Sequence, residues 1–155
     1  MRGKSATQRP VTPDPKYGNE NVARFTNLVM RDGKKSTAMR VIYDAFDIIG
    51  EKTKLNPVEV FENALKNVMP TLEVKSKRVG GANYQVPMPV RGERRFMLAA
   101  RWILVATRAK KGRPMAIKLS DELIAASKNE GDAVKKKADV QRMAEANRAF
   151  AHFAR

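Results

Sequence analysis

The chain contains no cysteine and a single histidine, His152. It can therefore form neither a disulfide nor a thiolate metal site, and it cannot assemble a zinc site or a Ser-His-Asp triad of the usual composition. The longest apolar run, residues 96–106, is too short to span a bilayer and is interrupted by Arg101. Residues 1–18 lack the apolar core of a signal peptide. We therefore expect a cytoplasmic protein that is not an enzyme, that binds no metal or cofactor and that has no membrane span.

Acidic residues are few for a chain so rich in basic ones. The 155 residues include 31 lysines and arginines against 16 acids, which gives a formal net charge of +15. The excess is local, because residues 75–118 hold twelve basic residues and a single acid, Glu93, while residues 1–18 carry a smaller excess. Charge concentrated in this way predicts a polyanionic partner, with nucleic acid the leading candidate and an anionic membrane surface the weaker one.

Apolar residues recur at helical spacing along most of the chain, which predicts a mainly α fold with about six helices in a single bundle. Residues 1–18 are polar, contain three prolines and show no periodicity, so we expect a flexible basic arm followed by one helical domain over residues 19–155. Heptads are not sustained, and no homo-oligomer is expected. The expected helices cover residues 19–31, 36–50 (with Ser36 as N-cap and Gly50 as the end), 57–69, 93–109, 115–127 and a segment capped by Asp132.

Two of these helices carry distinctive signals. Asn56 is an expected N-cap, with Pro57 at the first helical position and Glu59 three residues after the cap. The helix over residues 93–109 is apolar around most of its circumference, which predicts that it is the central buried one. Its Trp102 is then expected in the core, with stacking on a nucleic-acid base as the alternative.

Residues 72–90 alternate apolar and polar side chains around a glycine pair, which predicts a two-stranded β-hairpin between the third and fourth helices. A three-residue loop that begins at Gly80 pairs Val74 with Met88 and gathers the apolar residues on one face. A two-residue loop divides the apolar residues between the faces. We therefore predict the three-residue loop.

Pro87 and Pro89 constrain the ribbon further. Residues two apart in a strand point their N–H groups to the same side, and both prolines lack that group, so that side must be an open edge. A two-stranded ribbon is marginal in water, so its base is expected to rest on the helices through Leu72 and Val90 while its tip projects. Tyr84 either covers the apolar face of the ribbon or stacks on a base.

The basic residues of the ribbon either form an ordinary charged loop or contact nucleic acid. Contact is favoured because the charge continues into the next helix through Arg91, Arg94 and Arg95. Charge dispersed over an arm, a ribbon and a helix suits folded RNA better than a compact DNA-recognition helix, and a nucleoid-type DNA-binding protein is the alternative. For the lysines at 34–35 and 135–137, simple exposure and contact with phosphate are equally compatible with the pattern.

Five stretches make the prediction more specific: PDPKYG, DGKKSTA, FENALKNVMPTLEVKSKRVGGANYQVPMPV, AARW and AVKKKADVQRMAEANRAFAH. In order and spacing, over roughly residues 13–153, they resemble the bacterial form of the seventh small-subunit ribosomal protein family. The resemblance implies a helical domain with a protruding β-hairpin that binds the 3′ domain of small-subunit ribosomal RNA (rRNA). It also implies that the protein nucleates assembly of the subunit head and lies near the decoding centre and the exit-site transfer RNA (tRNA).

The resemblance further implies partners and contact residues. The ninth and eleventh small-subunit ribosomal proteins are expected neighbours, and some family members repress their own messenger RNA, which makes that RNA a further candidate. rRNA contact carries over to matching basic residues: Lys16, Lys34, Lys35, Lys75, Arg78, Arg91, Arg94, Arg95, Lys136 and Arg142. The charge distribution adds Arg2, Lys4, Arg9, Lys77, Arg101, Lys110, Arg113 and Lys118 to the expected rRNA-binding set. The ribbon tip expected near tRNA comprises Arg78, Gly80, Gly81, Ala82, Asn83 and Tyr84.

Overall fold

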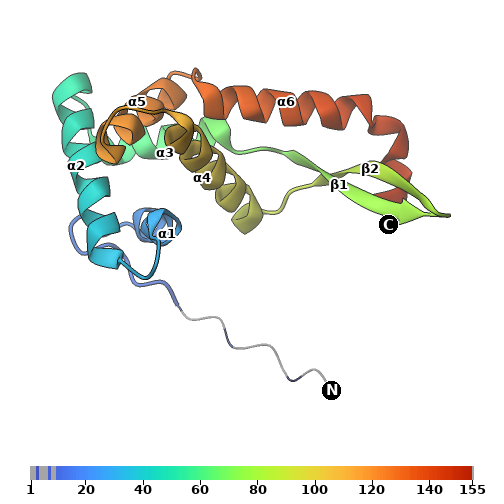
Figure 1. The fold of residues 1–155 in the computed structure, drawn as a ribbon, viewed down its shortest axis with the longest axis horizontal. Coiled ribbons are helices and arrows are strands. Elements are labelled where there is room, and N and C mark those ends of the chain that lie inside the picture. Colours follow the sequence, from blue (N-terminus) through green and yellow to red (C-terminus); the bar gives the residue numbers. More distant parts are fainter. Residues whose placement is uncertain (1–2, 4–6, 8–9, 155) are drawn as a thin grey trace.

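A computed structural model describes residues 3, 7 and 10–154. The chain folds into a helical domain from which one β-hairpin projects, so the predicted mainly α fold class is confirmed (Figure 1). Of the predicted flexible arm, residues 1–2, 4–6 and 8–9 lie outside the described residues. The elements, in chain order, are α1 (Glu20–Val29), α2 (Lys35–Thr53), α3 (Pro57–Val68), β1 (Leu72–Val79), β2 (Ala82–Pro89), α4 (Gly92–Ala109), α5 (Met115–Ser127), α6 (Asp132–Ala146) and the 3₁₀ helix η1 (Arg148–Ala154).

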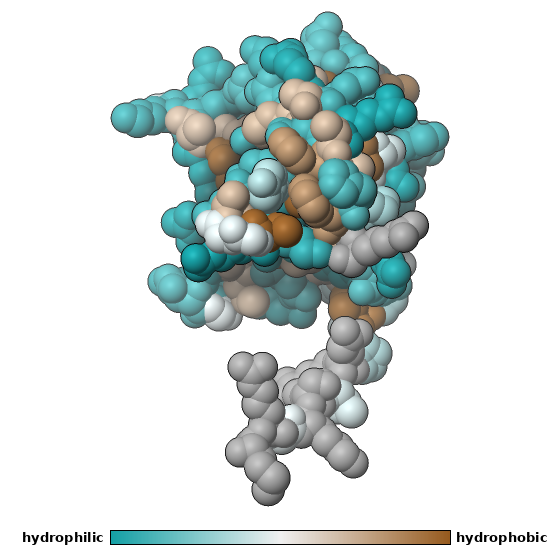
Figure 2. Space-filling model, turned by 90° about the vertical axis from the view of Figure 1, so that its right-hand side faces the viewer, coloured by the Kyte–Doolittle hydropathy of each residue, from teal (hydrophilic) through white to brown (hydrophobic). Residues whose placement is uncertain are grey.

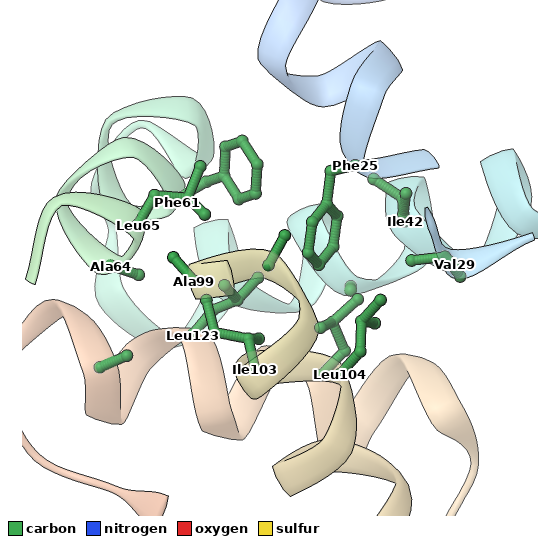
Figure 3. Packing of buried hydrophobic residues seen from close by; sticks show 14 of the residues in the cluster. Phe25, Val29, Ile42, Phe61, Ala64, Leu65, Ala99, Ile103, Leu104 and Leu123 are labelled. Carbon is green, nitrogen blue, oxygen red and sulfur yellow. The ribbon is translucent and has the colours of Figure 1, made fainter. Parts of the chain in front are cut away.

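The helices α1 to α6 contribute to one hydrophobic core. α5 packs against α2, α3 and α4, and the ring centroids of Phe25 on α1 and Phe61 on α3 lie 5.2 Å apart. Figure 3 shows Ile103 of α4 beside Leu123 of α5, and both side chains are completely buried. Complete burial of such a side chain stabilises the fold by about 1.5–3 kcal/mol. This core fixes the helical platform that carries the ribbon and the basic side chains.

The third helix begins and ends as predicted. The Asn56 side chain accepts a hydrogen bond from the Val58 N–H at 3.1 Å, and Pro57 occupies the first helical position. Pro70 follows two residues after the end of the helix at Val68. The N-cap, the proline at the first position and the spacing of the apolar residues all predict the same helix start. Local preference and tertiary packing therefore favour the same helix.

The second helix is longer than predicted at both ends. It begins at Lys35, without a side-chain cap from Ser36, and it continues through Gly50 to Thr53. Glycine in a helix costs about 1 kcal/mol relative to alanine. Ile49 on the same turn is completely buried, so core packing outweighs that local cost and the helix does not end at the glycine.

α4 is buried on one face only, so the prediction of a helix enclosed around most of its circumference is wrong. Its inner face includes the fully buried Ile103, whereas Arg101 is exposed and Val105 is 66% exposed. Trp102 lies between these faces, half-buried against the core, in agreement with the packing interpretation. The outer face of α4 is therefore accessible to a partner.

The packed part of the chain begins before residue 19, where the sequence places the end of the arm. The Asp14 carboxylate is buried and accepts a hydrogen bond from the Tyr43 hydroxyl at 3.0 Å, as well as bonds from the two backbone N–H groups that follow Pro15. The Tyr17 ring packs edge-on against Phe46, with centroids 5.2 Å apart. These contacts attach the end of the arm to α2.

The ribbon has a different register from the predicted one. Gly80 and Gly81 form a two-residue turn with φ of 58° and 92°, and Val74 lies opposite Pro87 rather than Met88. Two consecutive residues with positive φ give a turn whose twist matches that of the strands, and glycine adopts this conformation without strain. Turn chemistry therefore decides the register. Within the described residues the sheet has these two strands only, as the prolines of β2 predict.

The C-terminal part of the chain covers the apolar side chains that this register divides between the two faces. Figure 1 shows α6 running alongside the ribbon and η1 turning back towards its outer half. Val86 and Pro87 are adjacent in β2 and so point to opposite faces of the ribbon, and both are buried. Tyr84 packs against the rings of Phe150 and Phe153 of η1, a contact from outside the ribbon that neither interpretation of Tyr84 included.

Candidate nucleic-acid interface

Several of the predicted basic residues have exposed side chains on four separate parts of the domain. They come from the turn between α1 and α2, the tip of the ribbon, the start and outer face of α4, and the first turns of α6. Cations without an internal partner can neutralise phosphate without first breaking a contact. Within the part of the chain that the structure describes, six predicted residues have side chains without a hydrogen bond or ion pair, and we call them the interface cations: Lys34, Lys35, Arg78, Arg91, Arg101 and Lys136.

A buried carboxylate at the base of the ribbon engages two further predicted residues. Glu73 is 9% exposed, and its oxygens lie 3.0 Å from Lys75 Nζ and 3.1 Å from Arg94 Nη2. Burial raises the pKa of the Glu73 carboxyl, but the hydrogen bonds and charges of Lys75 and Arg94 together outweigh it and leave the pKa below its ordinary value. These contacts connect β1 to the start of α4, so Lys75 and Arg94 stabilise the ribbon base as well as charging it.

Glu73 makes part of the stability depend on pH. Because its pKa is lower in the folded chain than the ordinary value of 4.5, its contribution is fully present above that value and is lost as the pH falls through the folded pKa. We expect the melting temperature of the wild type to fall more between about pH 5 and about pH 3 than that of Glu73→Gln. Thermal unfolding followed by circular dichroism measures both.

Glu145→Gln is the matched control for this titration, because it replaces an exposed carboxylate that makes no ion pair with the described residues. It should follow the wild-type pH profile. Parallel profiles for the wild type and Glu73→Gln would contradict the assignment of this acid-sensitive share of stability to Glu73.

Five other predicted cations contact protein groups while keeping part of the side chain exposed. Exposed ion pairs of this kind contribute little to stability, so a phosphate group can replace a carboxylate partner at small cost. The contacts are Arg95 with the Pro70 carbonyl (3.1 Å), Lys77 with the Phe153 carbonyl (2.7 Å), Lys16 with Asp47 (3.3 Å), Arg113 with Asp121 (3.5 Å) and Arg142 with Asp139 (3.4 Å).

The side chains of Lys110 and Lys118 both contact other groups of the protein. Lys110 Nζ lies 2.5 Å from one oxygen of Glu122, whose side chain is completely buried, and the other oxygen accepts a hydrogen bond from the Ala133 N–H at 3.0 Å. Lys118 Nζ donates to the Lys110 carbonyl oxygen at 2.7 Å. The two lysines thus connect the end of α4 with α5 and the start of α6. Contact of these two lysines with rRNA stays a prediction. Their observed contacts support a role in stabilising the fold.

Arg31 and Arg108 are absent from the predicted contact residues but lie beside the α1–α2 turn. Both line a hollow of about 370 Å³ together with Lys34, and Arg108 Nη2 donates to the Val29 carbonyl oxygen at 3.3 Å. Burial, followed by the positive charge of Arg31, lowers the pKa of Arg108. An anion bound between the two guanidinium groups would relieve their repulsion. The helical spacing of Arg108 from Arg101, seven residues, is the sequence signal that places it on the same face of α4.

Three predicted residues, Arg2, Lys4 and Arg9, lie outside the described residues, so their contacts stay predictions. Among the residues that the structure covers, no group of three or more histidine, aspartate and glutamate side chains could hold a metal ion. None of the described helices combines the length and the apolar character needed to cross a membrane.

The sequence is similar to known proteins along almost its whole length. A family model described as Ribosomal protein S7p/S5e matches residues 1–148. The chain is 60% identical over 153 residues to the small ribosomal subunit protein uS7 of Thermotoga petrophila and 58% identical over 153 residues to that of Thermotoga maritima, with 99% of each chain covered in both cases. It is 60% identical over 146 residues to the uS7 protein of Moorella thermoacetica, with 94% of each chain covered. The similarity therefore includes the helices and the ribbon alike.

Proposed function

Because the chain belongs to the ribosomal protein S7p/S5e family, we propose that it binds the 3′ domain of small-subunit rRNA directly and nucleates assembly of the subunit head. The coarser part of this function follows from the family: the chain is a structural constituent of the small ribosomal subunit, acts in translation and is not an enzyme, as predicted. As a ribosomal protein it works in the cytoplasm.

The observation that carries the proposal of direct rRNA binding is the distribution of the interface cations. They lie on a turn, a ribbon tip and two helices that point in different directions, as Figure 1 allows the reader to follow. A protein that reads duplex DNA usually presents one helix to the major groove. Cations dispersed over several elements match an irregular RNA surface, where phosphates of several RNA helices converge.

The ribbon tip is proposed to approach the exit-site tRNA near the decoding centre. Arg78, Ala82 and Asn83 are exposed there, and apart from the glycine and its two chain neighbours no residue has an atom within 4 Å of the position that a Cβ of Gly80 or Gly81 would take. Open glycine backbone permits close approach of a sugar-phosphate chain. The ninth and eleventh small-subunit proteins, and the protein's own messenger RNA, are proposed as further partners on the family resemblance.

Filter binding to an rRNA fragment of the 3′ domain, compared with duplex DNA of equal length across a salt series, tests the proposal of rRNA binding. We expect tighter binding to the RNA at every salt concentration, with the logarithm of the association constant falling linearly with the logarithm of salt concentration. A preference for DNA throughout the series would overturn the proposal in favour of a nucleoid-type DNA-binding protein.

A further inference from the structure

The outer half of the ribbon has little apolar surface of its own. Residues 75–78 of β1 are all exposed, and a two-stranded ribbon with so little cover is marginal in water. The two glycines of its turn lose more conformational freedom on ordering than any other residue would. The contacts that hold this part of the ribbon in one position must therefore come from another segment of the chain.

The 3₁₀ helix η1 supplies contacts to both strands. On β2, the centroid of the Tyr84 ring lies 5.2 Å from that of Phe150 and 5.2 Å from that of Phe153. On β1, Lys77, which is paired with Tyr84 in the register, donates from Nζ to the Phe153 carbonyl oxygen at 2.7 Å. Ring pairs at these distances are attractive beyond the area that they bury. Both residues of this cross-strand pair, Lys77 and Tyr84, are thus in contact with η1.

Further contacts order η1 itself and join it to the rest of the ribbon. The His152 ring lies 4.0 Å from the Phe153 ring, and its Nδ1 is 2.8 Å from the Ala149 carbonyl oxygen. Nearer the base, Pro87 faces a groove of about 520 Å³ that Ala151 also lines. Figure 2, which views the molecule from the end that carries the ribbon tip and η1, shows apolar side chains gathered in the middle of a hydrophilic surround.

The rings of Tyr84, Phe150 and Phe153 form an aromatic cluster that is separate from the core of the helical domain. The core residues come from α1 to α6, and the described residues of this core do not include Tyr84, Phe150 or Phe153. A contact outside the cooperative core can open without unfolding the helices. The ribbon can therefore be released from η1 while the domain that carries it stays folded.

We propose that η1 is an intramolecular clamp that sets the orientation of the ribbon, with Phe150 and Phe153 as its positioning residues. With the clamp closed, the tip is held in one direction relative to α4 and α6. With the clamp open, the outer half of the ribbon frays. A ribbon held in place binds its partner without first losing conformational freedom, so the clamp serves any ligand of the tip.

Native-state hydrogen exchange on the full-length Phe150→Ala/Phe153→Ala variant tests the clamp. We expect the backbone amides of residues 76–86 to exchange at least about 10-fold faster than in the wild type, while those of α2 to α5 are unchanged. The ring protons of Tyr84, shielded by two neighbouring rings, should shift towards their values in an unstructured peptide. Phe150→Tyr/Phe153→Tyr, which keeps the rings, should restore both readouts. The test uses no RNA, so its result is independent of the function proposed above.

Leu55→Ala is the matched control, because it removes an apolar side chain that is 61% exposed and that lines a hollow with residues of α2, α3 and α5 but with none of the ribbon or η1. It should leave ribbon exchange as in the wild type. Tyr84→Ala approaches the same contact from the other strand and should speed exchange in residues 148–153. Ribbon exchange within twofold of the wild type in the double variant would overturn the proposal. So would general unfolding of both variants, because it would make the cluster part of the core.

Discussion

Lys110→Met is expected to lower the melting temperature by about 6–12 °C, which corresponds to about 3 kcal/mol for a domain of this size. The loss does not come from Lys110 itself, whose side chain is 37% exposed and can be hydrated. It comes from Glu122, whose completely buried carboxylate would keep only its hydrogen bond from the Ala133 N–H. A buried charge without a partner must either remain at high cost or take up a proton.

The backbone around Glu122 is closely packed, which limits relaxation. A Cβ on Gly131, whose φ is 96°, would come within 3.0 Å of Glu122 Oε1 and 3.2 Å of the Ala125 side chain. The chain between α5 and α6 therefore passes directly over the carboxylate. The full cost of the unpaired charge should then appear in the free energy of unfolding.

Glu122→Gln is the informative comparison. The amide keeps the shape of the carboxylate and its oxygen can still accept the Ala133 N–H, so we expect a smaller loss of about 1–2 kcal/mol. Lys110→Met/Glu122→Gln should be more stable than Lys110→Met alone, because the second change removes the buried charge. Lys111→Met removes an exposed neighbouring lysine and should leave the melting temperature within about 2 °C of the wild type. If Lys110→Met unfolds at the same temperature as Lys111→Met, the structural role of the pair is wrong.

The sequence predicts elements correctly where local and tertiary preferences agree. Asn56 and Pro57 define the start of α3, and the apolar spacing of the same segment selects the same boundary. The register of the ribbon is missed because those preferences conflict. A single apolar face favours pairing Val74 with Met88, whereas the glycine pair favours a two-residue turn. The turn decides the register, and η1 packs against Tyr84 on the strand that it shifts. That contact comes from a segment more than sixty residues along the chain, which alternation within residues 72–90 cannot reveal.

Positive charge in the sequence predicts where a polyanion binds more reliably than which cation contacts it. Arg91 and Lys110 are indistinguishable by composition, since both lie in the basic stretch from residue 75 to 118. In the fold, Arg91 is exposed at the start of α4, whereas Lys110 is engaged by a carboxylate in the interior. The position of Glu122 within an apolar helical stripe, three residues after Leu119, is the one local sign that a buried acid requires a cation.

Removing Lys34, Lys35 and Arg101 together by substitution with alanine is expected to weaken binding to a 3′-domain rRNA fragment by about 10²-fold at about 0.1 M salt. Each of these interface cations is exposed and has no ion pair among the described residues, so its charge is available to pair with phosphate. Phosphate neutralisation releases counterions, and the loss of three contacts should flatten the salt dependence of the association constant by about 2–3 logarithmic units per decade. Filter binding across a salt series measures both quantities.

The matched control is Lys54→Ala/Lys66→Ala/Lys128→Ala, which removes the same charge from three exposed lysines that also make no ion pair with the described residues. These lysines lie outside the predicted interface, so this variant should lose little affinity and keep the wild-type salt slope. Both triple variants should unfold within about 1 kcal/mol of the wild type, because exposed side chains without partners contribute little to stability. Equal weakening in the two variants would mean that binding depends on net charge rather than on this surface. An unequal loss with a flattened slope in the interface variant alone would identify the α1–α2 turn and the outer face of α4 as the part of the fold that contacts phosphate.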